Sequence, residues 1–142
     1  MSGRVTAIAA ALALALAGCE TEIGEPAYGS NGVSAIQFKD LPVPAEFRLL
    51  ERFHESDSVR AGDYRYGNFI YRGQPSIAEA SAFLESRMPQ HSWRLIDTKA
   101  NDDGTERELV FRRNPYTATC QLSQHDSLTE LRIQLRTQRE EQ

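Results

Sequence analysis

The sequence predicts an α+β fold, in which one amphipathic helix packs on one face of a mainly antiparallel sheet as a two-layer sandwich. A single run of apolar residues at helical spacing lies between residues 77 and 88. Runs of alternating apolar and polar residues precede and follow it, and this spacing is typical of strands. Asp103-Gly104 separates two of these runs, and an Asp-Gly pair in that position favours a hairpin because it tolerates positive φ. The expected order of elements is β-β-α-β-β-β-β.

Two alternating segments precede the helix. In residues 46–53, Phe47 and Leu49 share one side of an extended chain, which indicates a half-buried strand. Residues 63–71 are richer in aromatic side chains, and Gly67 interrupts their alternation. Because a glycine inside a strand often marks a bulge or a close backbone approach, we expect a second strand with a kink near Gly67.

The helix has recognisable signals at both ends. Ser76 and Glu79 have the spacing of a capping box, in which each side chain bonds to the backbone amide of the other. Pro89 cannot continue a helix, so the helix should end at Met88 or one residue earlier. Between these limits one face carries apolar or small residues at helical spacing: Ile77, Ala80, Ser81, Leu84 and Met88.

Four alternating segments follow the helix, at residues 92–98, 107–113, 117–124 and 131–136. The last of them has the clearest strand pattern, with apolar and polar residues in strict alternation. Consecutive strands joined by short turns pair antiparallel. One helix covers one sheet face, so the other face should meet solvent and carry four arginines: Arg94, Arg112, Arg132 and Arg136.

The first eighteen residues have the pattern of a signal peptide. Arg4 gives a positively charged start, and Val5–Ala17 contains no charge and no proline. A membrane-spanning helix needs about 20 apolar residues, so this run is too short to be one. Leu16-Ala17-Gly18-Cys19 resembles the lipobox of bacterial lipoproteins. The resemblance implies a diacylglyceryl lipid on Cys19 and cleavage between Gly18 and Cys19; an ordinary secretory signal is the alternative.

These patterns divide the chain into a signal peptide (1–18), a lipidated flexible tether (19–40), a single α+β domain (41–137) and a disordered tail (138–142). Residues 20–31 have no apolar periodicity and cannot bury enough surface to offset the cost of ordering them. Val33, Ile36 and Phe38 could instead add a short strand or dock loosely. Leu41-Pro42-Val43-Pro44 then imposes an extended start of the domain, because proline fixes φ.

Lipid on Cys19 implies attachment to a bacterial membrane on its periplasmic or extracytoplasmic side. In some lipoproteins an aspartate after the cysteine favours the inner membrane; Glu20 is not that signal, so the outer membrane is expected. Loss of Arg4 with the signal peptide changes the formal net charge from −4 to −5. This balance disfavours nucleic acid as a partner. Cys120 would be the only thiol left, which excludes an intramolecular disulfide.

The sequence predicts that the domain is not an enzyme, and no cofactor or metal is expected. Cys120 and His125 form the only close thiol and imidazole pair, but residues five apart on a strand point to opposite faces. A buried, inert Cys120 is therefore expected, and an envelope hydrolase or thiol enzyme using Cys120 is the alternative. Asp102-Asp103 and Glu140-Glu141 fall in an expected turn and tail. The histidines lack the short spacing of metal ligands: His54, His91 and His125.

Two features remain as candidate binding surfaces for an envelope protein or a cell-wall partner. One is the arginine set on the open sheet face, because guanidinium groups match phosphate and carboxylate geometry. Its alternative is cross-strand pairing with Glu106, Glu108 and Glu130. The other is the aromatic strand from Tyr64 to Tyr71, with Tyr64 and Tyr66 as candidate contacts. Its alternative is a core strand whose tyrosine hydroxyls reach the rim.

The mature domain also resembles an uncharacterised group of small bacterial lipoproteins. Three segments carry the resemblance: Leu41-Pro42-Val43-Pro44-Ala45-Glu46-Phe47, Tyr64-Arg65-Tyr66-Gly67 with Tyr71-Arg72-Gly73, and Met88-Pro89-Gln90-His91-Ser92-Trp93. Ser92 departs from the glycine that precedes the tryptophan in that group. The group has no assigned activity, so the resemblance implies domain boundaries and no catalytic residue.

Overall fold

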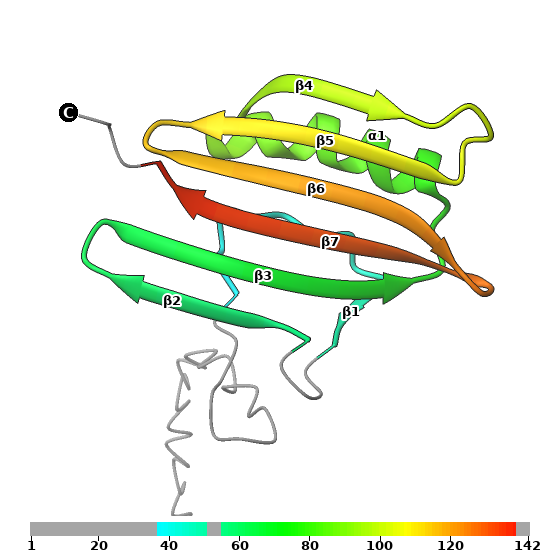
Figure 1. Cartoon of the computed structure of the whole chain (residues 1–142), viewed down its shortest axis with the longest axis horizontal. Helices are drawn as coiled ribbons and strands as arrows, with labels where there is room; N and C mark the ends of the chain where they lie inside the picture. The colour runs from blue at the N-terminus through cyan, green and yellow to red at the C-terminus, as the bar shows by residue number, and fades with distance from the viewer. Residues whose placement is uncertain (1–36, 51–54, 139–142) are drawn as a thin grey trace, which may run out of the picture.

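The computed structural model of the chain describes residues 37–50 and 55–138. Within them, seven strands form one antiparallel sheet, and a single α-helix covers one of its faces (Figure 1). The predicted α+β two-layer sandwich is confirmed. The helix is α1 (Ile77–Arg87), continued by the short 3-10 helix η1 (Met88–His91). The strands are β1 (Phe47–Leu49), β2 (Asp57–Ala61), β3 (Tyr64–Gly73), β4 (Arg94–Ala100), β5 (Glu106–Arg113), β6 (Tyr116–His125) and β7 (Leu128–Thr137).

The predicted order of elements misses one strand. The sheet order is β1-β3-β7-β6-β5-β4, and β2 pairs with the other half of the β3 edge that β1 occupies. The chain therefore runs β-β-β-α-β-β-β-β. The sequence of β2 shows no hydrophobic alternation. Its buried inward residue is the polar Ser58, and its apolar Val59 is exposed. The first strand is also shorter than expected, and residues 51–54 of that prediction lie outside the described part.

The predicted capping box is present at the start of α1. The Glu79 backbone amide donates to Ser76 Oγ at 3.2 Å, and the Ser76 amide donates to Glu79 Oε2 at 2.8 Å. These bonds satisfy amides that the first helical turn leaves without partners. The buried face of α1 carries Ala80, Ser81 and Leu84, as the spacing predicted.

The core lies between α1 and the covered face of the sheet. Its large, fully buried side chains come from four strands, from the helical segment and from the residue that precedes β4: Phe69, Leu84, Met88, Trp93, Leu109, Phe111, Leu122, Leu131, Ile133 and Leu135. The opposite face of the sheet has no helix over it in the described part of the chain (Figure 1). We call it the open face.

Gly67 does not kink β3, contrary to the sequence-based expectation. It pairs with Ser58 on one side and Leu135 on the other, without a shift in register. Close packing explains the glycine, since a Cβ atom there would come within 3.2 Å of the Phe38 ring and even closer to the Phe69 ring. The register shift of the sheet lies instead in β4, between Leu95 and Asp97.

Packing reaches back into the segment that was predicted to be a tether. Phe38 is buried and meets the Phe69 ring edge-on, with 5.8 Å between the ring centroids. The Trp93 indole donates to the Asp40 carbonyl oxygen at 2.7 Å. The packed domain therefore begins no later than Phe38, earlier than the expected boundary at residue 41, because one aromatic side chain adds to the core.

Candidate binding surface

Pairing between strands aligns three arginines on the open face. Residues directly opposite each other on neighbouring strands share a face. Arg94 pairs with Arg112, Arg112 with Thr117, Thr117 with Arg136, and Arg136 with Tyr66. These five residues cross β4, β5, β6, β7 and β3 in one line, and we call them the arginine row. Because neighbouring strands lie about 4.8 Å apart, the row is about 19 Å long.

The arginines of the row have no carboxylate partner among the described residues. Neither Arg94, Arg112 nor Arg136 forms an ion pair there. The guanidinium carbon of Arg136 lies over the Tyr66 ring, 5.1 Å from the ring centroid. Arg94 and Arg112 are directly opposite each other, an arrangement that is unfavourable for like charges. The glutamate pairing expected as the alternative is therefore absent from this row.

Arg132 differs from the other three predicted arginines. It shares the open face but lies four residues from Arg136 along β7, about 13 Å away. Its guanidinium is 3.6 Å from Glu130 Oε1, and Glu130 also accepts a hydrogen bond from Arg72 at 3.0 Å. Arg132 thus pairs with a glutamate of its own strand and not across strands as the alternative expected, and the structure brings together the other three arginines.

The two candidate surfaces meet at one end of the sheet. Phe69 and Tyr71 of β3 are buried in the core, whereas Tyr64 and Tyr66 lie on the open face. Tyr66 belongs to the arginine row itself. The aromatic strand is thus divided between core and surface, and its two candidate contact residues adjoin the arginines. The sequence could assign each residue to a face, but it could not show that the two sets converge.

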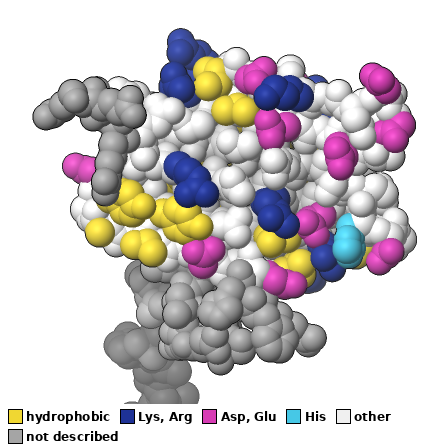
Figure 2. Space-filling model, in the orientation of Figure 1, with side chains coloured by type: hydrophobic (Ala, Val, Ile, Leu, Met, Phe, Trp, Pro, Cys, Tyr) yellow, Lys and Arg dark blue, Asp and Glu magenta, His cyan; other side chains and the backbone are white. Residues whose placement is uncertain are grey.

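Exposed hydrophobic side chains flank the arginine row at both ends. In the described ranges the large ones are Val59 (51% exposed), Tyr64 (43%), Ile96 (41%) and Leu95 (38%). Val59 pairs with Tyr66 on the open face, and Ile96 lies in the β4 bulge two residues after Arg94. Leu95 pairs with the buried Phe111 and so belongs to the covered side of this edge. Figure 2 shows one hydrophobic group over the left ends of β2 and β3 and a smaller one over β4. Sequence reasoning missed Val59, Leu95 and Ile96 as surface features, because an apolar residue in a strand normally indicates core.

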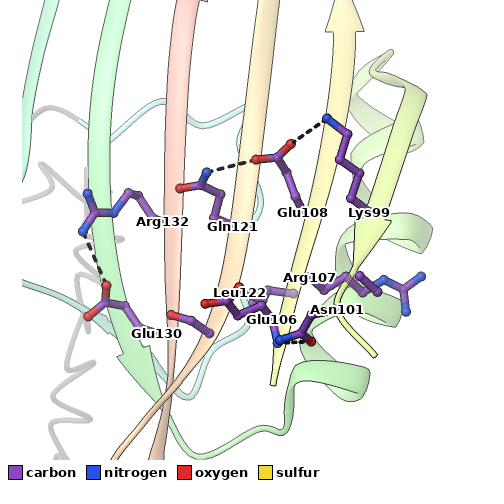
Figure 3. A pocket seen from close by; sticks show the side chains of 11 residues that line it. Lys99, Asn101, Glu106, Arg107, Glu108, Gln121, Leu122, Glu130 and Arg132 are labelled. Carbon is purple, nitrogen blue, oxygen red and sulfur yellow. Dashed lines mark hydrogen bonds and ion pairs between the residues drawn. The ribbon is translucent and has the colours of Figure 1, made fainter. Parts of the chain in front are cut away.

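The other end of the open face contains a polar hollow of about 530 Å³ (Figure 3). Its charges are largely paired with one another. Lys99 Nζ is 3.8 Å from Glu108 Oε1, and Gln121 donates to Glu108 Oε2 at 2.9 Å. Arg132 and Glu130 form the ion pair described above. The hollow is therefore a surface whose charges the fold already satisfies.

A buried ionic cluster lies at the rim of the covered face, behind the arginine row. Arg65 donates two hydrogen bonds to the carboxylate of Asp40, at 2.9 and 2.5 Å, and its side chain is only 9% exposed. Arg113 reaches the same carboxylate at 2.6 Å. The Arg65 guanidinium stacks on Phe38, with 4.2 Å to the ring centroid. Sequence reasoning missed this cluster because Arg65 and Arg113 are 25 and 73 residues away from Asp40.

The electrostatics of Asp40 follow from its two arginine partners. Burial alone would raise the pKa of the Asp40 carboxyl group. The hydrogen bonds from Arg65 and the positive charges of Arg65 and Arg113 outweigh burial, so that the pKa is lowered from its usual value. The carboxylate is therefore charged at neutral pH and balances the otherwise uncompensated arginines.

Cys120 and His125 do not form a catalytic pair in this structure. Cys120 is completely buried on the covered face, and desolvation raises the pKa of its thiol to about 12. His125 is exposed at the end of β6. The odd spacing therefore separates the two side chains, as predicted from a regular strand.

The remaining titratable candidates are dispersed. Over the described ranges, no group of three or more His, Cys, Asp and Glu side chains is placed to hold a metal ion. His91 ends η1, and Asp103 lies in the β4–β5 turn, where hydrogen bonds from Thr105 lower the pKa of its carboxyl group. His54 and Glu140-Glu141 lie outside the described residues, as do Gly18 and Cys19.

Comparison with protein-family models, with curated proteins and with solved structures finds no match for this chain. No helix in residues 37–50 or 55–138 is long and apolar enough to cross a membrane.

Proposed function

We propose that this chain is a lipid-anchored protein of the bacterial envelope and that its domain is a non-catalytic module that binds an anionic partner through the open face. The observation that carries the binding role is the arginine row. Three guanidinium groups share one end of the open face, and none of them has a carboxylate partner among the described residues. Arginine is suited to such a role because it is always charged and forms paired hydrogen bonds with carboxylate and phosphate groups.

The anchoring half of the proposal rests on Leu16-Ala17-Gly18-Cys19, which supplies a lipobox behind a short apolar segment. Lipid on Cys19 would hold the domain at a membrane, since two or more acyl chains anchor a protein far more durably than one. The non-catalytic half is supported by the burial of Cys120 and the raised pKa of its thiol. A nucleophilic cysteine needs an accessible thiolate and a neighbouring base, and Cys120 has neither.

Membrane fractionation tests the anchor. Cells that produce the wild-type chain should retain it in the membrane fraction after a carbonate wash, whereas the Cys19→Ala variant should not carry lipid. Metabolic labelling with a palmitate analogue provides an independent readout, because it reports lipid on the chain directly. An unlabelled wild-type chain would contradict the anchor.

Photo-cross-linking in intact envelopes tests the open face. A cross-linking residue at position 117 lies inside the arginine row, one at position 123 lies at the opposite end of the same face, and one at position 82 lies on the exposed side of α1. Capture should be strongest from position 117. Equal or stronger capture from position 82 would place the contact on the helix layer and contradict the proposal.

A further inference from the structure

The apolar and cationic groups of the open face occupy the same end of the sheet in a fixed order. Ile96 lies in the β4 bulge next to Arg94, Arg112 and Arg136 follow on β5 and β7, and Tyr66 on β3 and Val59 on β2 complete the line. With about 4.8 Å between neighbouring strands, the line from β4 to β2 is about 24 Å long. Its centre is cationic and both of its ends are apolar.

The arrangement differs from the usual protein interface, whose fully buried centre is depleted in charged residues. Here the charged residues form the centre. The polar hollow that a small ligand would use lies at the opposite end of the face, where the charges are paired. A flat anionic surface fits the observed order better, because it can neutralise several guanidinium groups together while apolar side chains at the margin enter it.

The positive charge at this end is local. The chain as a whole has a formal net charge of −4, so general basicity does not explain three unpaired arginines in one row. Arg94 and Arg112 lie directly opposite each other on the neighbouring strands β4 and β5. The guanidinium of Arg136 packs on the Tyr66 ring. Bound anions would relieve the repulsion between the first two.

We propose that the arginine row, with its flanking hydrophobic side chains, lies on the anionic phospholipid surface of the membrane that carries the anchor. Arginine binds phosphate groups, and tyrosine favours the boundary between headgroups and acyl chains. This inference rests on the proposed function, because an anchor at Cys19 is what places the domain close to lipid.

The chain between the anchor and the domain is long enough for this contact. Residues 19–36 lie between the lipidation site and the first described residue. A segment of 18 residues spans at most about 60 Å when fully extended. This length allows the open face to reach the bilayer while the lipid stays inserted.

Vesicle binding without the lipid anchor tests the inference. The mature-length chain with Cys19→Ala, exported behind an ordinary cleavable signal peptide, is mixed with vesicles of phosphatidylcholine alone or with 30 mol% phosphatidylglycerol at low ionic strength; this composition is roughly that of a moderately anionic bilayer. Circular dichroism and thermal melting establish that each variant is folded. Co-sedimentation should show binding to the anionic vesicles only, and binding should weaken as salt is added.

Two matched variants locate the contact. Substitution of Arg94, Arg112 and Arg136 by Gln should weaken binding by about a hundredfold, since each basic residue near an anionic bilayer contributes a factor of about five. The control removes the same charge from the opposite end of the open face, through Arg48→Gln, Lys99→Gln and Arg132→Gln. It should bind within about threefold of the wild-type chain, because these side chains lie away from the row.

Equal losses in the two variants would show that net charge alone drives binding and would overturn the inference. Equal binding to neutral vesicles, or no binding to either kind, would overturn it too. In the last case, capture of a protein from position 117 would identify a protein partner instead. Because the test protein carries no lipid, vesicle binding can fail while Cys19-dependent membrane attachment stands, and the two proposals fail separately.

Discussion

The two ends of the open face differ in how their charges are satisfied. At the hollow, Glu108 lies between Lys99 and Gln121, and Arg132 pairs with Glu130. At the arginine row, by contrast, Arg94 on β4 lies directly opposite Arg112 on β5. In the sequence, Arg132 and Arg136 occupy equivalent positions four residues apart on one strand. The residue two positions earlier on β7 decides which of them finds a carboxylate, because Glu130 precedes Arg132 and Gln134 precedes Arg136.

The comparison extends through the sheet to its covered face. Behind the arginine row, Arg65 and Arg113 lie next to Tyr66 and Arg112 in the sequence and share the carboxylate of Asp40. This end of the sheet therefore concentrates positive charge on both faces. One half-buried carboxylate compensates the covered side, and no described residue compensates the open side.

Asp40→Asn should have the largest effect on stability. The substitution leaves Arg65 buried beside Arg113 without a counter charge, and loss of one partner of a buried ion pair typically costs about 3–5 kcal/mol. Because Asp40 remains partly accessible, we expect a decrease of about 3 kcal/mol in the free energy of unfolding, measured by urea titration. Lys99→Gln is the control at the hollow end, where the lysine is 71% exposed. It should change the same free energy by about 0.5 kcal/mol or less.

The pH dependence of stability should report the same carboxylate. The pKa of Asp40 is lowered in the folded state, so its stabilising effect is complete above the ordinary aspartate value of about 3.9 and is lost as the pH falls through the folded value. The difference in unfolding free energy between the wild-type chain and Asp40→Asn should be constant near neutral pH and shrink in acid. A difference that grows below about pH 4 would contradict the assignment.

Substitution of Cys120 should affect folding and not chemistry. Cys120→Ser places a hydroxyl group in the apolar core, which costs about 1–3 kcal/mol when no hydrogen-bond partner is available. Cys120→Ala should cost less, because it buries no polar group. In the native protein, a thiol reagent at pH 8 should label Cys120 far more slowly than in the urea-unfolded chain, since burial raises the pKa of the thiol to about 12. Rapid labelling of the native protein would revive the thiol-enzyme alternative.

The sequence predicted the layers of this fold better than the contacts within them. The helix followed from local signals, Ser76 with Glu79 at one end and Pro89 at the other. Periodicity also placed the four arginines on one face, because alternation is a local signal that belongs to each single strand. The strand β2 was not predicted because its inward side chain is a serine and not an apolar residue.

Features that depend on pairing between distant segments were not predictable. The arginine row requires the register of five strands, and the Asp40 cluster requires partners from β3 and β5. Gly67 was recognised as a special position, but only the Phe69 and Phe38 rings above it show that it serves close packing instead of a kink. Long-range geometry of this kind leaves no signal at a fixed spacing in the sequence.

The smallest expected effect separates the two ends of the open face by its sign. Arg112→Gln removes a charge that lies directly opposite Arg94, so relief of repulsion should raise the free energy of unfolding by about 0.2–1 kcal/mol. Arg132→Gln removes a partner of Glu130 and should lower it by about 0–1 kcal/mol. Both substitutions change the net charge equally, which makes each the control for the other. Added salt should reduce both effects, because both arise between solvent-exposed charges. If both substitutions lower the free energy of unfolding equally at low salt and neither does at high salt, the loss of positive charge from a chain of net charge −4 is responsible, and the two ends of the face do not differ.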